Sequence, residues 1–146
     1  AMAAGLSLAP ENLDAFRAAF TTLAAERLDP AALRAELLSD GALAPQDLSR
    51  DLAEQLRDGG PWGQGFPEPV FDDEFTVAGW RVVGNNHLKL QLRHTASGFP
   101  IDAIHFGGYD GTPPASRLHL AYQLETDDFR DRCGVQLLVR HRVDLP

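Results

Sequence analysis

The stretch HLKLQLR, residues 87–93, alternates apolar and polar side chains without a break. Leu88, Leu90 and Leu92 fall on one side of an extended chain, and the other side carries His87, Lys89, Gln91 and Arg93. A period of two residues predicts a β-strand with one buried face and one solvent-exposed face. Because the exposed face carries two permanent positive charges, this strand is the first candidate for a binding surface.

The same period recurs through the second half of the chain. It predicts four further strands, at residues 75–83, 101–106, 118–124 and 135–143. The alternation slips at Gly79, which predicts a β-bulge in the first strand. Five short strands with the longest break after the third are typical of an antiparallel barrel of the oligonucleotide/oligosaccharide-binding (OB) kind. An SH3-like barrel and an open meander are also consistent with the pattern.

The first half of the chain has a helical period instead. Apolar residues three to four apart predict an amphipathic helix between Pro10 and Glu26, and a second helix over residues 47–56 that ends at Gly59. Weaker patterns predict short strands at residues 5–8 and 34–39. The expected fold class is α+β, with a mainly helical segment over residues 1–59, a junction over 60–71 and a five-stranded antiparallel OB-fold-like barrel over 72–146.

The junction GPWGQGFPEPVF, residues 60–71, contains three glycines, three prolines and three aromatic residues. Such a segment is too broken for a helix and too rich in proline for a central strand. A simple spacer has no need of large rings, so we expect Trp62 and Phe66 to be packing anchors that join the two halves.

Composition limits the class of protein. The chain has 146 residues, of which 44% are hydrophobic, enough for a packed core. A single cysteine, Cys133, excludes an internal disulfide and a four-cysteine zinc site, which favours a cytoplasmic location. No apolar run approaches the roughly 20 residues of a membrane span. The chain opens on Ala1 rather than methionine, as expected for a piece of a longer protein or for an added residue before Met2.

Charge is unevenly distributed along the chain. The net charge of −8 argues against nucleic acid as a general partner. Residues 75–101 nevertheless contain no acidic residue, and they hold Arg81, His87, Lys89, Arg93 and His94. The sequence therefore predicts a local basic surface on an acidic protein.

Several motifs together resemble one family. The junction, HLKLQLR, IDAIHFG at 101–107 and VQLLVRHRV at 135–143 resemble, in order, the C-terminal region of RecJ, the bacterial 5′→3′ exonuclease family specific for single-stranded DNA. AMAAGLSL at 1–8 is similar to the tail of a motif in that family's DHH-associated domain, and SDGAL at 39–43 matches a stretch before its barrel.

The resemblance implies a division of labour. A catalytic DHH domain upstream would hold two Mn²⁺ or Mg²⁺ ions on Asp and His residues, and the OB-fold barrel would hold single-stranded DNA. The catalytic motifs are absent here, so we expect this chain to bind DNA without hydrolysing it. Where the family tends to have Asn and Arg-Gly before the last strand, residues 127–131 read DDFRD. The extra acids make that loop a poor DNA contact.

The expected DNA-binding residues share a basic or aromatic side chain on the barrel: Arg81, His87, Lys89, Arg93 and Tyr109. Lys89 and Arg93 would lie roughly 13 Å apart at ~3.3 Å per residue, about two nucleotide steps of an extended strand. His105 and His119 have no ligand pair close by in sequence, so no metal site and no catalytic residues are expected in this chain.

Three functions remain open at this point. The first is a module that binds single-stranded DNA within a RecJ-like exonuclease of DNA repair and recombination. The second is a protein-interaction barrel that docks a single-strand-binding protein or another repair factor. The third is a brace that acts only on its own catalytic core.

Overall fold

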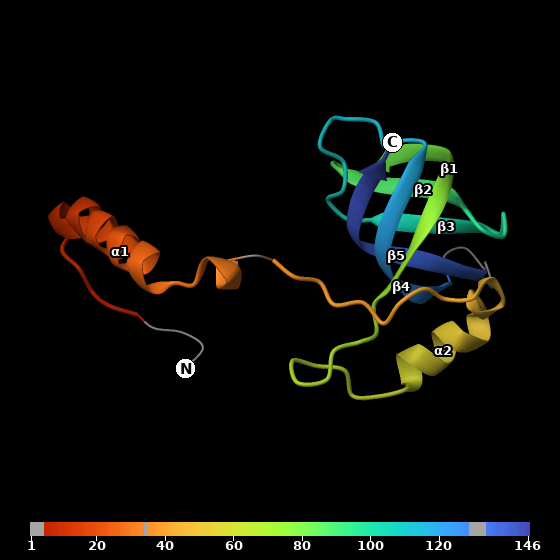
Figure 1. Ribbon diagram of the computed structural model, residues 1–146, viewed down its shortest axis with the longest axis horizontal. Coiled ribbons are helices and arrows are strands. Elements are labelled where there is room, and N and C mark those ends of the chain that lie inside the picture. Colours follow the sequence, from red (N-terminus) through yellow and green to blue (C-terminus); the bar gives the residue numbers. More distant parts are fainter. Residues whose placement is uncertain (1–4, 34, 129–133) are drawn as a thin grey trace. The chain divides into compact units, whose positions relative to one another are not determined.

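The computed structural model describes residues 5–33, 35–128 and 134–146. Their packing divides the chain into two compact units, Ala1–Leu37 and Leu38–Pro146. The first unit contains two short 3₁₀ helices, Pro10–Asn12 and Pro30–Leu33, and α1 (Leu13–Arg27). The second contains a 3₁₀ helix and α2, followed by five strands: Pro45–Asp47, α2 (Arg50–Asp58), β1 (Phe71–Val83), β2 (His87–His94), β3 (Pro100–His105), β4 (Arg117–Asp127) and β5 (Gly134–Leu145) (Figure 1).

Helix α1 confirms the first predicted helix but buries none of its side chains within the described residues. Pro10 lies in the first turn of the preceding 3₁₀ helix, where its missing N–H has no cost. The strands predicted at 5–8 and 34–39 are wrong over the described residues, which have no regular structure there. An extended segment needs a ladder partner to become a strand, and neither segment has one. Arg34 lies outside the described residues.

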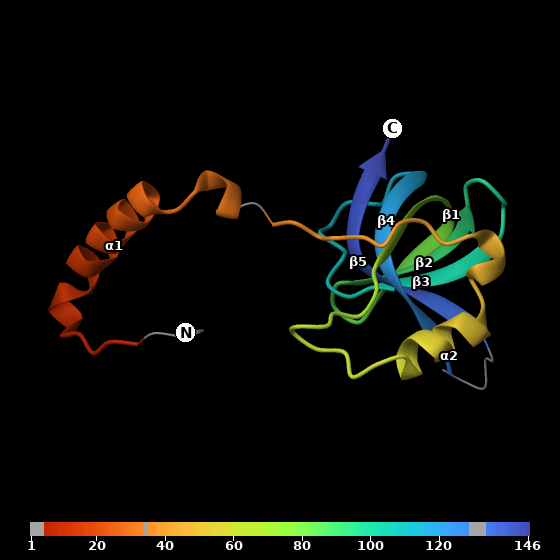
Figure 2. The ribbon, with the colours of Figure 1, turned by 60° about the horizontal axis from the view of Figure 1, so that its bottom comes forward.

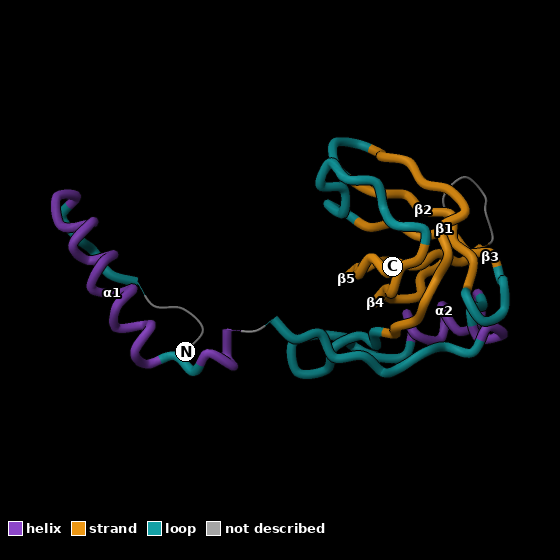
Figure 3. The backbone as a smooth tube through the Cα atoms, turned by 45° about the horizontal axis from the view of Figure 1, so that its top comes forward, coloured by secondary structure: helices purple, strands orange, loops and turns teal. Residues whose placement is uncertain are grey.

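The five strands close into a barrel in the order β1-β2-β3-β5-β4 (Figure 3). This confirms the predicted OB-like barrel, with one difference: β3 and β5 pair in parallel, whereas the other four pairings are antiparallel. A closed ring with an odd number of strands cannot have every neighbour antiparallel, so one parallel pair is required. The sequence pattern does not reveal this pair because it reports strands and not their neighbours.

A β-bulge interrupts the pairing of β1 with β2, as the slip in the sequence predicts. Val77 pairs with Leu92 and Gly79 pairs with Gln91, which leaves Ala78 as the extra residue. A second irregularity lies between β4 and β5, where Ala121 pairs with His141 and Tyr122 with Val139. Each bulge reverses which side chains beyond it face the interior.

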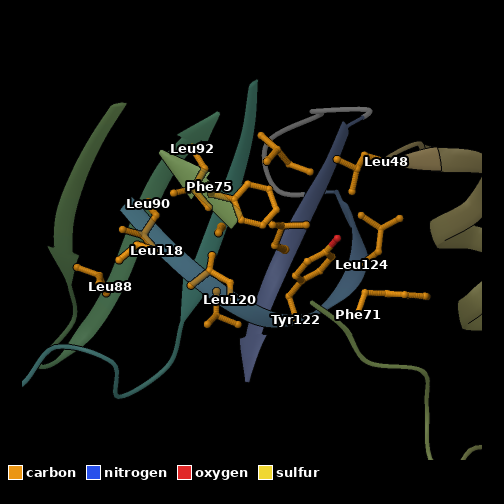
Figure 4. Close-up of a cluster of buried hydrophobic side chains, with 14 of the residues drawn as sticks. Leu48, Phe71, Phe75, Leu88, Leu90, Leu92, Leu118, Leu120, Tyr122 and Leu124 are labelled. Atoms are coloured by element: carbon orange, nitrogen blue, oxygen red, sulfur yellow. The ribbon is translucent and has the colours of Figure 1, made fainter. Parts of the chain in front are cut away.

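The core fills the inside of the barrel with one side chain from every second strand residue (Figure 4). Leu88, Leu90 and Leu92 of β2 are 0–2% exposed, which confirms the alternation of HLKLQLR. Phe75 and Tyr122 meet edge to face at 5.7 Å between ring centroids. Burial, and then the nearby carboxylates of Asp73 and Asp72, raises the pKa of the Tyr122 hydroxyl well above its ordinary value.

Helix α2 closes one side of the barrel, where it contacts β4 and β5 (Figure 2). Its N-cap Ser49 accepts a hydrogen bond from Leu52 N–H, and its apolar face buries Ala53 at 1% exposure. Leu48, just before the N-cap, is 3% exposed. Figure 4 shows Leu48 beside Leu124 at the edge of the core. The helix predicted at 47–56 is thus part of the barrel unit. The division at residues 59 and 71 remains a prediction about domain identity.

The Gly/Pro junction folds back on the end of α2. Gly63 and Phe66 exchange two backbone hydrogen bonds, and Trp62 Nε1 donates to the carbonyl of Leu56 at 2.9 Å. Trp62 also stacks on Phe66 with 4.7 Å between ring centroids. Phe71, at the other end of the junction, lies in the barrel core. Trp62 therefore anchors the junction to α2, as expected, and Phe71 anchors it to the barrel. Phe66, the other expected anchor, stacks on Trp62 but is 53% exposed.

The segment SDGAL pairs with the start of β1. Asp40 N–H donates to the carbonyl of Val70 at 2.7 Å, and Asp72 N–H donates to the carbonyl of Gly41 at 3.1 Å. The carboxylate of Asp72 accepts hydrogen bonds from the Ser39 hydroxyl and from His119 Nε2 on β4. These two donors, Ser39 first, hold the pKa of Asp72 below its ordinary value.

Replacing a core leucine should destabilise the barrel strongly. Leu120→Ala removes a side chain that is 0% exposed, so we expect the free energy of unfolding to fall by about 2–5 kcal/mol. The matched control Leu38→Ala removes a side chain that is 84% exposed and should change it by less than about 0.5 kcal/mol. Urea unfolding followed by circular dichroism measures both; equal losses would contradict this description of the core.

The Asp72 carboxylate should make stability depend on pH in the acid range. Because its pKa is lower folded than unfolded, its contribution is present above the unfolded value of about 3.9 and is lost as pH falls through the folded value. Asp72→Asn should therefore be less stable than the parent at pH 7, and the gap should shrink below about pH 4. Urea unfolding at both pH values tests this, with the exposed Asp14→Asn as control; a constant gap would count against it.

Candidate nucleic-acid interface

The basic residues of the predicted DNA surface lie on the outside of β1 and β2. Lys89, Gln91 and Arg93 of β2 point away from the buried leucines, and on β3 Asp102 pairs in register with Gln91. In the parallel pair of β3 and β5, Asp102 is in register with Gln136. The outer faces of β1, β2, β3 and β5 therefore form a continuous polar surface.

The bulge at Ala78 decides the position of Arg81. Without the extra residue, Arg81 would share the face of Val77, which is opposite the buried Leu92. With it, Arg81 lies directly opposite Lys89 on the outer face. Cβ atoms of directly opposed residues are about 4.5–5.5 Å apart, and like charges there repel. The structure thus places two cations side by side in a position that costs stability.

Residue 79 is a glycine, and the absence of a side chain there leaves space next to Arg81 and Lys89. Gly79 lies opposite Gln91, and a Cβ at position 79 would come within 2.8 Å of Gln91 Oε1. The Gln91 amide therefore lies over the backbone of β1. The resulting hollow, of about 170 Å³, is lined by Trp80, Arg81, Lys89, Gln91 and Asp102.

A larger hollow adjoins the first one, sharing Gln91 and Asp102. It measures about 560 Å³ and continues past Arg93, Phe99 and Pro100 to Asp127 and Val135. The two hollows together are called the strand groove below. The groove crosses β1, β2 and β3, so an extended ligand lying in it would pass Arg81, Lys89 and Arg93 in turn.

The three cations of the strand groove differ in their partners. Lys89 Nζ donates to Gln136 Oε1 at 3.2 Å and lies 3.8 Å from Asp102 Oδ2. Arg93 donates to the carbonyl of Gly98 at 3.3 Å. Arg81 is exposed and forms no salt bridge with a carboxylate in the described part of the chain. Arg81 is therefore the cation most available to an anionic ligand.

His87 and Tyr109 lie at the end of the barrel and outside the strand groove. His87 Nδ1 accepts a hydrogen bond from Gly107 N–H at 3.0 Å, so this histidine braces the loop after β3. Tyr109 is half-buried and stacks on Trp80, with 6.0 Å between ring centroids. Tyr109, which the sequence predicts to contact DNA, is thus partly covered, and Trp80, at 40% exposure, is the more open partner.

Two residues of the acidic segment before β5 are described, and they differ in exposure. Asp127 is 7% exposed, and Asp128 accepts a hydrogen bond from Arg50 NH1 at 2.9 Å. That bond is the main cause of a lowered pKa at Asp128. The sequence predicts that the loop at 127–131 is a poor DNA contact. Its residues 129–131 lie outside the described residues, as does Cys133.

The described residues offer no metal site. No three His, Cys, Asp or Glu side chains meet within residues 5–33, 35–128 and 134–146. His119 is hydrogen-bonded to Asp72, and burial, followed by the charges of Arg142 and His141, lowers the pKa of His105. The part of the chain that the structure describes therefore offers no ligand set for the metal ions implied by the family resemblance. No helix in the same ranges is long and apolar enough to span a membrane.

Removing the Arg81 charge should stabilise the protein. Arg81→Gln relieves the repulsion from Lys89, so we expect the free energy of unfolding to rise by roughly 0.2–1 kcal/mol at low salt and by less at high salt. Arg93→Gln is the matched control, because Arg93 lies opposite Thr76 and Pro100, which are uncharged. Urea unfolding at two salt concentrations measures both variants; a loss of stability in Arg81→Gln would contradict the assigned pairing.

Comparison with known proteins points to one family. The RecJ OB domain family matches residues 39–141. The single-stranded-DNA-specific exonuclease RecJ of Dickeya dadantii is 43% identical over 144 residues, covering 97% of this chain and 25% of that protein. The protein of the same name from Escherichia coli is 39% identical over 142 residues, covering 95% and 25%. The chain thus spans about a quarter of the length of these curated relatives.

Solved structures agree on the fold. Crystal structures of RecJ from Thermus thermophilus in complex with Mg²⁺ and with Mn²⁺ align with TM-scores of 0.72 and 0.73, each at 20% identity. The alignments cover 96% and 97% of this chain, and 21% and 20% of those chains. From the match over residues 39–141 and the identity to these relatives, the chain belongs to the RecJ family and carries its OB domain.

Proposed function

We propose that this chain holds single-stranded DNA in the strand groove for a nuclease centre that lies elsewhere in a RecJ protein. The observation that carries the proposal is the placement of Arg81 directly opposite Lys89 beside the hollow opened by Gly79. Two cations held together against their own repulsion form a ready site for an anion, and a phosphate between them would remove the repulsion.

The groove suits a flexible single strand in particular. Proteins that bind single strands without sequence preference use a basic groove that follows the phosphate backbone. The groove is lined by three cations, Arg81, Lys89 and Arg93, and by two carboxylates, Asp102 and Asp127, so its net charge is positive. The relatives are named single-stranded-DNA-specific exonucleases, which agrees with this ligand class. A DNA ligand in a bacterial cell also implies the cytoplasm as the place of action.

Hydrolysis is assigned to the rest of the protein. The described residues supply no metal ligand set, and the Thermus thermophilus structures are complexes of that protein with Mg²⁺ and with Mn²⁺. We therefore propose that this chain contributes binding and orientation of the strand, within an exonuclease of repair and recombination. By itself it is expected to show no nuclease activity.

Docking of a repair protein, such as a single-strand-binding protein, is the second candidate. It is favoured by the net charge of −8, which repels DNA from the protein as a whole. A protein partner would not require the two opposed cations, so the charge variants described next separate the two candidates.

Binding of single-stranded DNA should depend on salt and on the opposed cations. A fluorescent strand of about 20 nucleotides, titrated with the chain, should bind with a log–log salt slope of about −0.7 per phosphate contact. Arg81→Gln and Lys89→Gln should each weaken binding by roughly ten-fold and make the slope shallower. Fluorescence anisotropy at three salt concentrations measures both effects.

Two control variants sharpen this titration. Arg57→Gln removes a charge from α2, which packs against β4 rather than the groove, and should leave the affinity unchanged. Asp102→Asn removes the carboxylate beside Lys89 and should tighten binding. If the folded chain binds no strand at low salt, the proposal fails and the protein-docking candidate takes its place.

A further inference from the structure

The end of the barrel carries exposed aromatic surface that extends beyond the strand groove. Trp80 is 40% exposed and Phe106 is 63% exposed, although both lie on or next to well-packed strands. Tyr109 stacks against Trp80 with an interplanar angle of 27°, and Phe106 meets the ring of His87 edge-on at 5.2 Å. Large exposed rings held in place by neighbours are typical of a binding surface rather than of a core.

Trp80 and Arg81 leave β1 on opposite faces. Trp80 pairs with Leu90, whose side chain is buried, whereas Arg81 pairs with Lys89 on the outside. Consecutive Cα atoms are only about 3.8 Å apart, so the aromatic surface and the cation pair are neighbours separated by the thickness of one strand. Trp80 also borders the hollow that contains Arg81 and Lys89.

The edge of β1 is open at this point. Pairing of β1 with β4 ends at Thr76 and Arg117, and the last backbone contact on that side is Val77 N–H to the carbonyl of Ser116 at 2.8 Å. Within the described residues, positions 79–83 pair with β2 alone. A ligand in the groove can therefore pass around this edge from one face of β1 to the other.

We propose that Trp80, supported by Tyr109, is a stacking site for one nucleobase of the strand whose phosphates bind Arg81 and Lys89. The inference rests on the proposed function and adds the residue that contacts a base. Stacking on an aromatic ring is favourable for every base, and it supplies the part of single-strand binding that does not depend on salt. The hydroxyl of Tyr109 donates to the carbonyl of Gly111 at 3.3 Å, which fixes the supporting ring in its loop.

Trp80 provides its own reporter for the test. The chain has two tryptophans, and Trp62 is held against Leu56 and Phe66 at the junction. In a Trp62→Phe background, Trp80 is the single tryptophan. Its emission is followed during titration with a ten-nucleotide thymidine strand and with a strand of equal length that has the same phosphates but no bases.

The expected result is that both strands bind and only the base-bearing strand quenches Trp80. Trp80→Ala should weaken binding of the base-bearing strand by about 5- to 100-fold and leave the baseless strand unaffected. Trp80→Tyr should retain most of the affinity because it keeps an aromatic face. Tyr109→Ala should produce a smaller loss, again confined to the base-bearing strand.

The possible failures are distinguishable. If both strands bind but Trp80 is not quenched, or if Trp80→Ala weakens both equally, the stacking site is wrong and the groove stands. If neither strand binds to the folded protein at low salt, the proposed function itself is wrong. Circular dichroism of each variant shows that the barrel is intact, and Trp80→Tyr tests the site if the alanine variant does not fold.

Discussion

The candidate interface depends on one extra residue in β1. Side chains of a strand alternate between the two faces, so an inserted Ala78 exchanges inside and outside for all residues that follow it in the strand. Before the bulge, Phe75 and Val77 face the core; after it, Gly79 and Arg81 face solvent. This exchange of faces places Arg81 beside Lys89 and leaves the hollow over Gly79. It also puts Trp80 and Arg81 on opposite faces of β1. A barrel with the same composition and no bulge would direct the guanidinium of Arg81 toward leucine.

Closure of the barrel determines which side chains are neighbours. Five strands in a ring require one parallel contact, and the chain supplies it between β3 and β5. That contact brings Gln136 next to Asp102, and through Asp102 next to Lys89. The polar setting of Lys89 is thus assembled from residues 13 and 47 positions away in sequence. Because the acid and the amide both contact the ammonium group of Lys89, Arg81 is left as the cation most open to an external partner.

Most of the barrel could be predicted from the sequence, because alternation of apolar residues reports burial directly. The pattern correctly predicts the burial of Leu88, Leu90 and Leu92 and the slip at Gly79. The role of Asp102 and Gln136 could not be predicted, since period-two patterns do not specify strand order. The hydrogen bonds of Asp72 with Ser39 and His119 could not be predicted for the same reason. Of the proposed DNA residues, Arg81 and Lys89 come together, Arg93 lies farther along the groove, and His87 and Tyr109 belong to the barrel end.

Helix α2 and the SDGAL segment define where this domain physically begins. Backbone hydrogen bonds join Asp40 to Val70 and Gly41 to Asp72, and Leu48 and Ala53 pack onto the core. Residues 38–70 therefore belong to the same packed unit as the barrel. A shortened chain that starts at Phe71 would keep all five strands and still expose the apolar side that α2 covers. It would be prone to self-association through that uncovered side. Transplanting the domain onto another enzyme therefore requires moving the polypeptide from about residue 38, well upstream of the first strand.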